Sequence, residues 1–246
     1  KPSTKPHSKL LDMRSIPLEV TEMRELRILQ AGVLDHAFVS EAMLRMQQQR
    51  IDDEIPDTLI LVEHPEVVTI GPKAIRDDVE VSGYSTSIVD RGGGITYHGP
   101  GQLVGYPIIK WRQDEQSIRG IINSIEDWVM AAFADCGVVG ERNEAMMGVW
   151  VGDHKVCSIG LAFKHWVSRH GLAINYDIPG TRIEDLPCCG LDVGSTTSLS
   201  RLGHGHDLSG RPIDRQRLEE ALFATCEEFL DRTPSEPIEW TPVLLV

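Results

Sequence analysis

The glycine-rich segment at residues 91–102, RGGGITYHGPGQ, restricts what this chain can fold into more than any other part of its sequence. Five glycines and a proline fall within twelve residues, which excludes the interior of a regular helix or strand. The GxxxxGK[ST] spacing of a phosphate loop and the GxGxxG spacing of a dinucleotide site are both absent. We therefore expect a loop that lines a ligand cleft, with Arg91, Thr96, Tyr97 and His98 as its polar groups. A tight surface turn between strands is the alternative.

Length and charge exclude several classes of protein. The 246 residues suffice for one substantial core, and we expect a flexible lead-in at 1–15 followed by a single domain at 16–246. A net charge of −13 argues against nucleic-acid binding. No apolar run approaches eighteen residues, so no membrane span is predicted. Residues 154–176 contain Lys, Arg and His but no Asp or Glu; this basic strip either attracts an acidic partner or is a chance gap in the acids.

Hydrophobic periodicity predicts alternating helices and strands. Apolar residues at helical spacing predict helices at 35–50, 115–136 and 215–231, the second of them followed by a left-handed cap at Gly137. Apolar runs of strand length predict strands at 58–63, 103–109 and 166–176, and a hairpin formed by 149–151 and 155–163. This mixture predicts an α/β (α+β) fold in which helices flank a mixed sheet.

The cysteines show neither disulfide nor zinc spacing; they are Cys136, Cys157, Cys188, Cys189 and Cys226. Reduced thiols, as in a cytoplasmic protein, are expected. Cys136 and Cys226 fall on the apolar faces of predicted helices, where a thiol acts as a small hydrophobic group. His204 and His206 have too few neighbouring ligands to predict a metal site.

Two adjacent cysteines stand where a thiol can react. Cys188 and Cys189 follow a proline in a polar connector and precede Gly190, so their side chains are expected to be partly exposed. A thiol attacks as its thiolate, which a nearby ammonium group stabilises. Lys155, in the strand-like run HKVCSIGLAF, is the candidate for that ammonium group. A solvated lysine at a strand edge is the simpler interpretation.

The chain resembles the lipoyl(octanoyl) transferase family in four successive segments: RGGGITYHGPGQLVGYPI, GVWVGDHKVCSIGLA, RHGLAINY and the CGL that includes Cys189. The run LVEHPEVVTIG at 61–71 adds to the resemblance, which covers about residues 15–200. It implies a fold like the catalytic domain of biotin and lipoate protein ligases. It also implies transfer of an octanoyl group from octanoyl-acyl carrier protein to a lysine of lipoyl domains. The implied acceptors are those of the 2-oxoacid dehydrogenase complexes and the glycine cleavage H protein.

The resemblance also implies the site residues. Cys189 matches the nucleophile and Lys155 its partner. The matching substrate-binding residues are Arg91, Gly92, Gly93, Gly94, Ile95, Thr96, Tyr97, His98, Ser158, Ile159, Gly160, Gly171, Leu172 and Ala173.

Two departures from the family pattern affect this assignment. Cys188 stands where the family commonly has proline, which leaves a choice between two adjacent thiols. Met146 and Met147 precede Gly148, where relatives more often have a threonine. Leu161, together with Ile159 and Leu172, is expected in the wall of an apolar slot for the acyl chain.

The implied mechanism is covalent. Cys189 takes the octanoyl group as a thioester, and the amine of the acceptor lysine then takes the octanoyl group from Cys189. No metal or other cofactor is needed, because the thioester already carries the activation energy. We expect a cytoplasmic monomer that binds neither nucleic acid nor membrane.

Other functions stay open on sequence alone. An ATP-dependent lipoate or biotin ligase shares the expected fold but requires ATP. A transferase that moves octanoyl or lipoyl groups between lipoyl carriers also uses a cysteine but has a different donor. An inactive binding module has no use for both Lys155 and Cys189. A Cys-His hydrolase using His98 or His170 releases free octanoate.

Overall fold

The computed structural model describes residues 24–143, 146–187 and 192–241. Cys188, Cys189 and the expected lead-in at 1–15 lie outside the described residues. The helices are α1 (His36–Ile51), α2 (Pro72–Arg76), α3 (Ile118–Asp135) and α4 (Arg215–Leu230), with short 3₁₀ helices at Gln113–Glu115 and Ser200–Leu202.

The described strands form two sheets. The larger is β1 (Arg24–Val33), β2 (Asp57–Glu63), β6 (Gln102–Ile108), β7 (Glu141–Arg142), β8 (Val149–Val151), β9 (His154–Lys164), β10 (Val167–Asn175), β11 (Arg232–Pro234) and β12 (Ile238–Glu239). Its order is β11-β1-β2-β6-β10-β9-β8-β7, with β12 also beside β1. The smaller is β3 (Val67–Ile70), β4 (Thr86–Ile88) and β5 (Ile95–His98), in the order β4-β3-β5.

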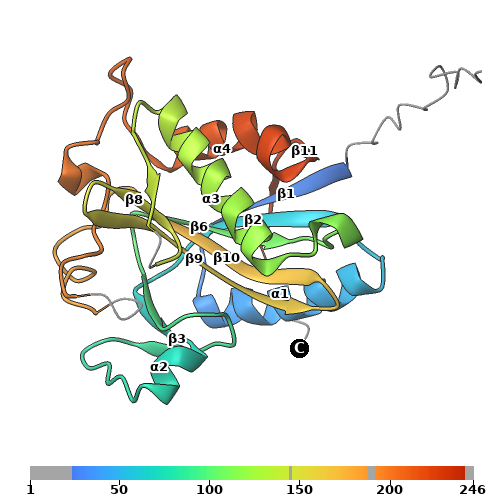
Figure 1. Cartoon of the computed structure of the whole chain (residues 1–246), viewed down its shortest axis with the longest axis horizontal. Helices are drawn as coiled ribbons and strands as arrows, with labels where there is room; N and C mark the ends of the chain where they lie inside the picture. Colours follow the sequence, from blue (N-terminus) through green and yellow to red (C-terminus); the bar gives the residue numbers. More distant parts are fainter. Residues whose placement is uncertain (1–23, 144–145, 188–191, 242–246) are drawn as a thin grey trace, which may run out of the picture.

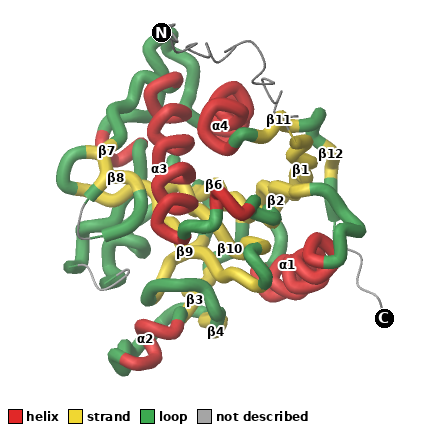
Figure 2. Tube along the Cα trace, turned by 45° about the vertical axis from the view of Figure 1, so that its right-hand side comes forward, coloured by secondary structure: helices red, strands yellow, loops and turns green. Residues whose placement is uncertain are grey.

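Helices cover both faces of the large sheet. In Figure 1, α3 and α4 lie on one face and α1 on the other, and Figure 2 shows the same arrangement from a second direction. The sheet mixes parallel pairs, such as β1 with β2, and antiparallel pairs, such as β2 with β6. The predicted mixed sheet flanked by helices is confirmed.

The central strands are apolar on both faces because each face is covered. In β2, Leu59 and Leu61 pack towards α3 and α4, whereas Ile60 and Val62 pack towards α1. Successive side chains of a strand point to opposite faces. This explains the continuous apolar runs at 58–63 and 103–109 that predicted buried strands.

The predicted helices are confirmed, with small differences at their ends. The Ser117 hydroxyl caps α3 by accepting a hydrogen bond from the Gly120 N–H at 3.1 Å. Gly137 follows the helix with φ +76°, as a left-handed cap requires. Ile118, the first residue of α3, is 54% exposed. Cys136 and Cys226 are both buried as expected.

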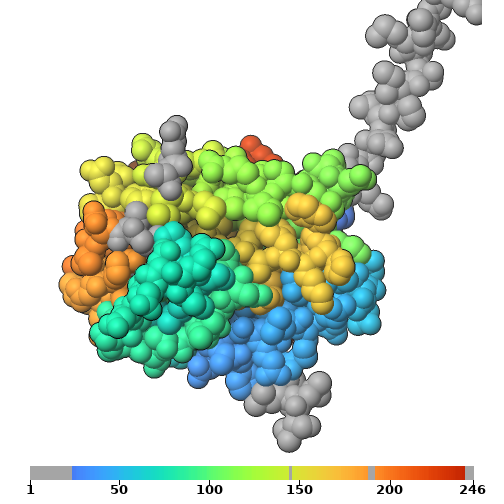
Figure 3. Space-filling model, turned by 60° about the horizontal axis from the view of Figure 1, so that its bottom comes forward, coloured from blue at the N-terminus to red at the C-terminus, as the bar shows by residue number. Residues whose placement is uncertain are grey.

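The small sheet was not predicted. Residues 91–102 are not one continuous loop, because β5 begins at Ile95 and β6 at Gln102. Only the first four residues and the Gly99-Pro100-Gly101 turn are irregular. Figure 3 shows the teal segment that contains the small sheet and α2 packed beside α1, which is blue. This unit places the glycine-rich residues against the large sheet.

The basic strip at residues 154–176 lies largely in the interior. The basic strip is not an exposed band, because Lys155, Arg169 and His170 are buried within it. No helix in the described ranges is long and apolar enough to cross a membrane.

Candidate active site

A cavity of about 250 Å³ lies between the large sheet, the small sheet and the start of α1. Lys155 lines it, as do the predicted substrate-binding residues Arg91, Gly92, Gly93, Gly94, Thr96, His98, Ser158, Ile159, Gly160, Gly171, Leu172 and Ala173. Segments far apart in the sequence therefore meet around one space. Leu161 is not among the lining residues and packs into the core on the α3 side of the sheet.

The glycine-rich segment folds around the side chain of Arg91, which is only 7% exposed. Its guanidinium group donates to the Gly94 carbonyl at 3.1 Å and to the Thr69 hydroxyl oxygen at 2.7 Å. A Cβ atom on Gly71 would lie 2.5 Å from the Gly93 carbonyl oxygen, so the backbones approach too closely for a side chain. Gly93 itself has φ +98°. The glycines thus allow a tight loop at one wall of the cavity.

Strand alternation divides the residues of β5 between two environments. Thr96 and His98 line the cavity. Ile95 and Tyr97 do not, because they pack into the small hydrophobic cluster that also contains Val68. Adjacent residues of a strand face opposite sides. Of the predicted ITYH run, only Thr96 and His98 therefore line the cavity.

Lys155 is 1% exposed, which is unusual for a lysine. Its backbone is fixed by a parallel bridge: Lys155 N–H donates to the Ser195 carbonyl at 2.8 Å, and Thr197 N–H donates to the Lys155 carbonyl at 3.1 Å. Its side chain passes over Gly148, where a Cβ atom would lie 2.6 Å from Lys155 Cε and 3.3 Å from Nζ. Gly148 N–H in turn donates to a Glu126 carboxylate oxygen at 2.9 Å.

The variant Gly148→Ala is expected to displace the Lys155 side chain and to lower activity at least about tenfold. Gly148 has φ +122°, and its added Cβ would also meet the Cys157 carbonyl oxygen. The matched control is Gly152→Ala, because Gly152 has φ +56° and no neighbour within 4 Å of an added Cβ. Both variants carry the ~1–3 kcal/mol cost of a left-handed residue. Melting temperatures and transfer rates, measured side by side, test this; equal activity in both variants contradicts it.

The cysteines in the described part of the chain do not suit nucleophilic attack. Cys136, Cys157 and Cys226 are all buried. Burial raises the pKa of Cys157 to about 12, although the charge of nearby Lys155 opposes the shift. Burial also raises the pKa of Cys226 to about 12. A thiol with so high a pKa is protonated at neutral pH and reacts slowly.

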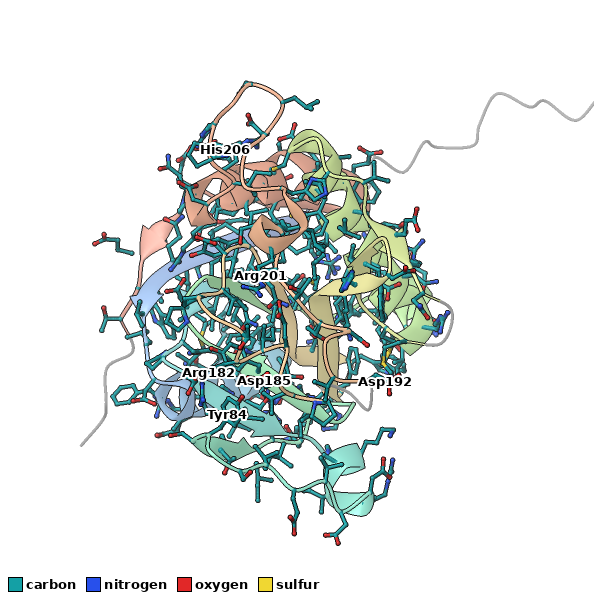
Figure 4. All side chains as sticks on the ribbon, turned by 90° about the vertical axis from the view of Figure 1, so that its left-hand side faces the viewer. Tyr84, Arg182, Asp185, Asp192, Arg201 and His206 are labelled. Carbon is teal, nitrogen blue, oxygen red and sulfur yellow. The ribbon has the colours of Figure 1, made fainter. Side chains whose placement is uncertain are left out.

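The described chain on either side of residues 188–191 is firmly anchored. Gly194 N–H donates to the Glu184 carbonyl at 2.8 Å, and the Glu184 carboxylate accepts from the Thr197 hydroxyl at 2.7 Å. Arg182 stacks on Tyr84, with 4.0 Å between the guanidinium carbon and the ring centroid. Figure 4 shows Arg182 and Tyr84 next to each other on this side of the molecule. Thr197 N–H also donates to the Lys155 carbonyl, so hydrogen bonds connect Glu184 through Thr197 to Lys155.

A cluster of imidazole rings forms another part of the cavity and was not predicted. This imidazole cluster consists of His36, His64 and His98, whose ring centroids are 5.4 to 5.9 Å apart. His36 and His98 line the cavity. No local pattern could identify His36 or His64, because each is a lone histidine beside the end of a helix or strand.

A chain of hydrogen bonds fixes His98. Gln102 Nε2 donates to the Tyr97 carbonyl at 2.9 Å and to Asn175 Oδ1 at 2.8 Å. The carbonyl can only accept, so Gln102 presents its oxygen to His98 Nδ1 at 2.7 Å, and Nδ1 carries the proton. Asn175 Nδ2 donates onward to the Thr197 carbonyl at 2.9 Å.

His170 lines the cavity with a strained backbone, at φ +60°. Its Nε2 lies 3.0 Å from Asp90 Oδ1, and Arg169 pairs with the same carboxylate at 2.5 Å. Burial lowers the pKa of His170 to about 4 despite the opposing effect of Asp90. Burial also holds the pKa of His98 well below its usual value. Both rings are therefore neutral at physiological pH.

Met146 and Met147, the second departure from the family pattern, line the cavity beside Lys155 and Ser158. His204 and His206 contribute to no metal site: in the described ranges, no group of three or more His, Cys, Asp or Glu side chains is arranged to hold a metal ion.

The sequence profile of the lipoyl protein ligase A/B catalytic domain matches residues 36–227. The chain belongs to this family. It is 38% identical over 200 residues to an octanoyltransferase of Syntrophobacter fumaroxidans, covering 78% of this chain and 87% of the relative. It is 37% identical over 188 residues to an octanoyltransferase of Chloroflexus aggregans, covering 72% and 85%. The predicted family resemblance is confirmed.

Two solved structures have the same fold as this chain. The putative lipoate protein ligase Ta0514 of T. acidophilum, with bound lipoic acid, superposes with a TM-score of 0.62 at 13% identity, covering 88% of this chain and 90% of that one. P. falciparum LipL1 in complex with lipoate gives a TM-score of 0.63 at 14% identity, covering 87% and 66%. The expected likeness to lipoate ligases is confirmed at the level of the fold.

Proposed function

We propose that this protein transfers an octanoyl group from octanoyl-acyl carrier protein to a lysine of lipoyl domains, as a step of lipoate biosynthesis. Relatives at 37–38% identity bear the name octanoyltransferase. The observation that carries the proposal is the placement of Lys155. This lysine is 1% exposed and lines a cavity whose other walls include Ile159, Leu172 and Ala173. A buried amine beside an apolar slot suits chemistry at the head of an acyl chain.

Cys189 is the proposed nucleophile. The described cysteines are buried with raised pKa values, which supports placing the reaction at one of the two remaining thiols. The family motif selects Cys189 over Cys188. Only five residues lie between Cys189 and Ser195, whose carbonyl accepts a hydrogen bond from the Lys155 N–H.

The proposed reaction has two balanced steps. In the first, the Cys189 thiolate attacks the thioester carbon, and the thiolate of the carrier arm leaves and takes up a proton. In the second, the amine of the acceptor lysine attacks the Cys189 thioester and loses a proton as the amide forms. The Cys189 thiolate is then regenerated. The Lys155 ammonium group stabilises the Cys189 thiolate in the first step and gives its proton to the leaving carrier thiolate. The neutral Lys155 amine then accepts the proton of the acceptor amine in the second step.

The proposed acceptors are lipoyl domains of the 2-oxoacid dehydrogenase complexes and the glycine cleavage H protein. We infer a cytoplasmic monomer with one catalytic domain at 16–246 that uses no metal or nucleotide. The neutral, weakly basic state of His98 and His170 counts against a Cys-His hydrolase, which needs a base whose pKa is near the working pH.

Transfer without ATP tests this function. The purified protein, octanoyl-acyl carrier protein and an apo lipoyl domain are incubated without nucleotide, and the acceptor is followed by intact-mass spectrometry. One octanoyl amide on the acceptor lysine is expected. Transfer that appears only with free octanoate and ATP identifies a ligase. Transfer only from an octanoylated lipoyl domain identifies a carrier-to-carrier transferase, and release of free octanoate identifies a hydrolase. Any of these three results contradicts the proposal.

A further inference from the structure

The cavity extends across the strands of the large sheet. Lys155 lies on β9, and β10 and β6 separate β9 from β2. Three strand spacings of ~4.8 Å therefore lie between β9 and β2, about 14 Å in all. His64 directly follows β2, and its ring is 5.4 Å from His36 and 5.7 Å from His98. The imidazole cluster thus lies across the sheet from Lys155.

Small side chains line the cavity on β9, the strand of Lys155, and on its neighbour β10. They are Ser158 and Gly160 on β9, and Gly171 and Ala173 on β10, whereas β6, the next strand towards β2, contributes Val104 and Tyr106. Small residues leave space above a sheet where larger ones would fill it. This space of about 250 Å³ has room for an unbranched acyl chain that extends from Lys155 towards the imidazole cluster.

Two rings of the cluster are held rigidly. His64 Nδ1 donates to the Leu34 carbonyl at 2.7 Å, which leaves Nε2 to accept from the Tyr106 hydroxyl at 2.8 Å. His98 is fixed by the Gln102 oxygen at 2.7 Å. A longer chain would have to break these buried hydrogen bonds to pass, at the cost of unpaired polar groups.

His36 differs from its two neighbours. It is 3% exposed, and its buried Nδ1 has no hydrogen-bond partner in the structure as described. Its ring stacks on His98 at 5.9 Å with 16° between the planes, and it lines the cavity. Burial lowers the pKa of His36 to about 3, so the ring is uncharged at neutral pH. An unpaired buried nitrogen does not stabilise the fold, so hydrogen bonding among the described residues does not explain a histidine at this position of the cavity wall.

We propose that His36 determines the length of acyl chain that the enzyme accepts, by closing the end of the cavity opposite Lys155. This inference rests on the proposed acyl transfer and extends it to the choice of substrate. The neutral ring forms a wall that an apolar methyl end can touch without meeting a charge. The rigid rings of His64 and His98 pack against His36.

A competition experiment tests the role of His36. Wild type, His36→Ala and His36→Trp are mixed with equal amounts of hexanoyl-, octanoyl-, decanoyl- and dodecanoyl-acyl carrier protein. Intact-mass spectrometry then measures the early distribution of protein adducts. His36→Ala is expected to raise the decanoyl-to-octanoyl ratio about tenfold, because two further methylenes become buried at ~0.8 kcal/mol each. His36→Trp is expected to shift the distribution towards hexanoyl.

Val39→Ala is the matched control. Val39 is fully buried one turn further along α1 but does not line the cavity. This variant also removes buried side-chain volume from α1, so it is expected to lower the melting temperature without changing the adduct distribution. A shift as large as that of His36→Ala would mean that the helix, and not His36, sets the length.

The outcomes distinguish this inference from the function on which it rests. An unchanged ratio in folded His36→Ala, with normal adducts in wild type, overturns the role of His36 alone. Wild type provides a second test that needs no variant: its adduct yield is expected to rise from hexanoyl to octanoyl and to fall at decanoyl. An equal yield for dodecanoyl overturns the inference. No adduct with any chain in wild type contradicts the proposed function, and this inference with it.

Discussion

Cys189→Ser is expected to abolish the octanoyl adduct on the protein, lowering the rate of transfer by at least about 1,000-fold. A serine hydroxyl is not ionised at neutral pH, and a buried lysine cannot ionise it as it can a thiol. The donor thioester therefore meets no competent nucleophile. Intact-mass spectrometry after mixing with octanoyl-acyl carrier protein, followed by peptide mapping, measures this directly.

Cys188→Ser is the matched control, since it changes the adjacent residue in the same way. It is expected to keep the adduct and most of the activity. Loss of the adduct in Cys188→Ser, together with its persistence in Cys189→Ser, would reverse the assignment of the two thiols. A stable adduct in the double variant would refute a nucleophile in this segment altogether.

Lys155→Met is expected to slow adduct formation by about 30-fold at pH 7. An ordinary thiol has a pKa of about 8.5, so only a few per cent is thiolate without the ammonium. Overall transfer is expected to slow further, because the proton acceptor of the second step is lost as well. Methionine retains most of the lysine volume, so the packing over Gly148 is expected to survive. Rates measured from pH 6 to 9.5 test the electrostatic part of this prediction.

The pH profile separates a catalytic role from a structural one. If Lys155 stabilises the thiolate, adduct formation by Lys155→Met recovers as the pH rises past the pKa of an unassisted thiol. A rate that stays low at every pH, in a folded variant, would contradict thiolate stabilisation. Lys164→Met is the control, because Lys164 is an exposed lysine on the same strand and is expected to leave the profile unchanged.

The sequence predicted the central elements because their apolar patterns are local. The runs at 58–63 and 103–109 are buried on both faces, and such strands leave a continuous apolar signature. The small sheet left none, because β4 has three residues and only one of them is even partly buried. Without that sheet, the glycine-rich segment could only be interpreted as a loop.

The candidate site could be predicted where its residues lie within a sequence motif. The motifs supplied Lys155, Arg91 and the short residues along β9 and β10. They did not show that Thr96 points into the cavity and Tyr97 away from it. The side of the sheet to which a residue points depends on where the strand begins. The imidazole cluster has no local signal, since His36, His64 and His98 meet only when a helix, a strand end and the small sheet pack together. Contacts of that kind are decided by tertiary structure.

The anchors around Glu184 have a consequence for protein engineering. The Glu184–Gly194 backbone bond, the Glu184–Thr197 contact and the Thr197–Lys155 bond form one continuous framework. A chimaera with a relative should therefore exchange residues 184–197 as an undivided module. A junction inside it would separate Cys189, the proposed nucleophile, from the hydrogen bonds that join this part of the chain to Lys155.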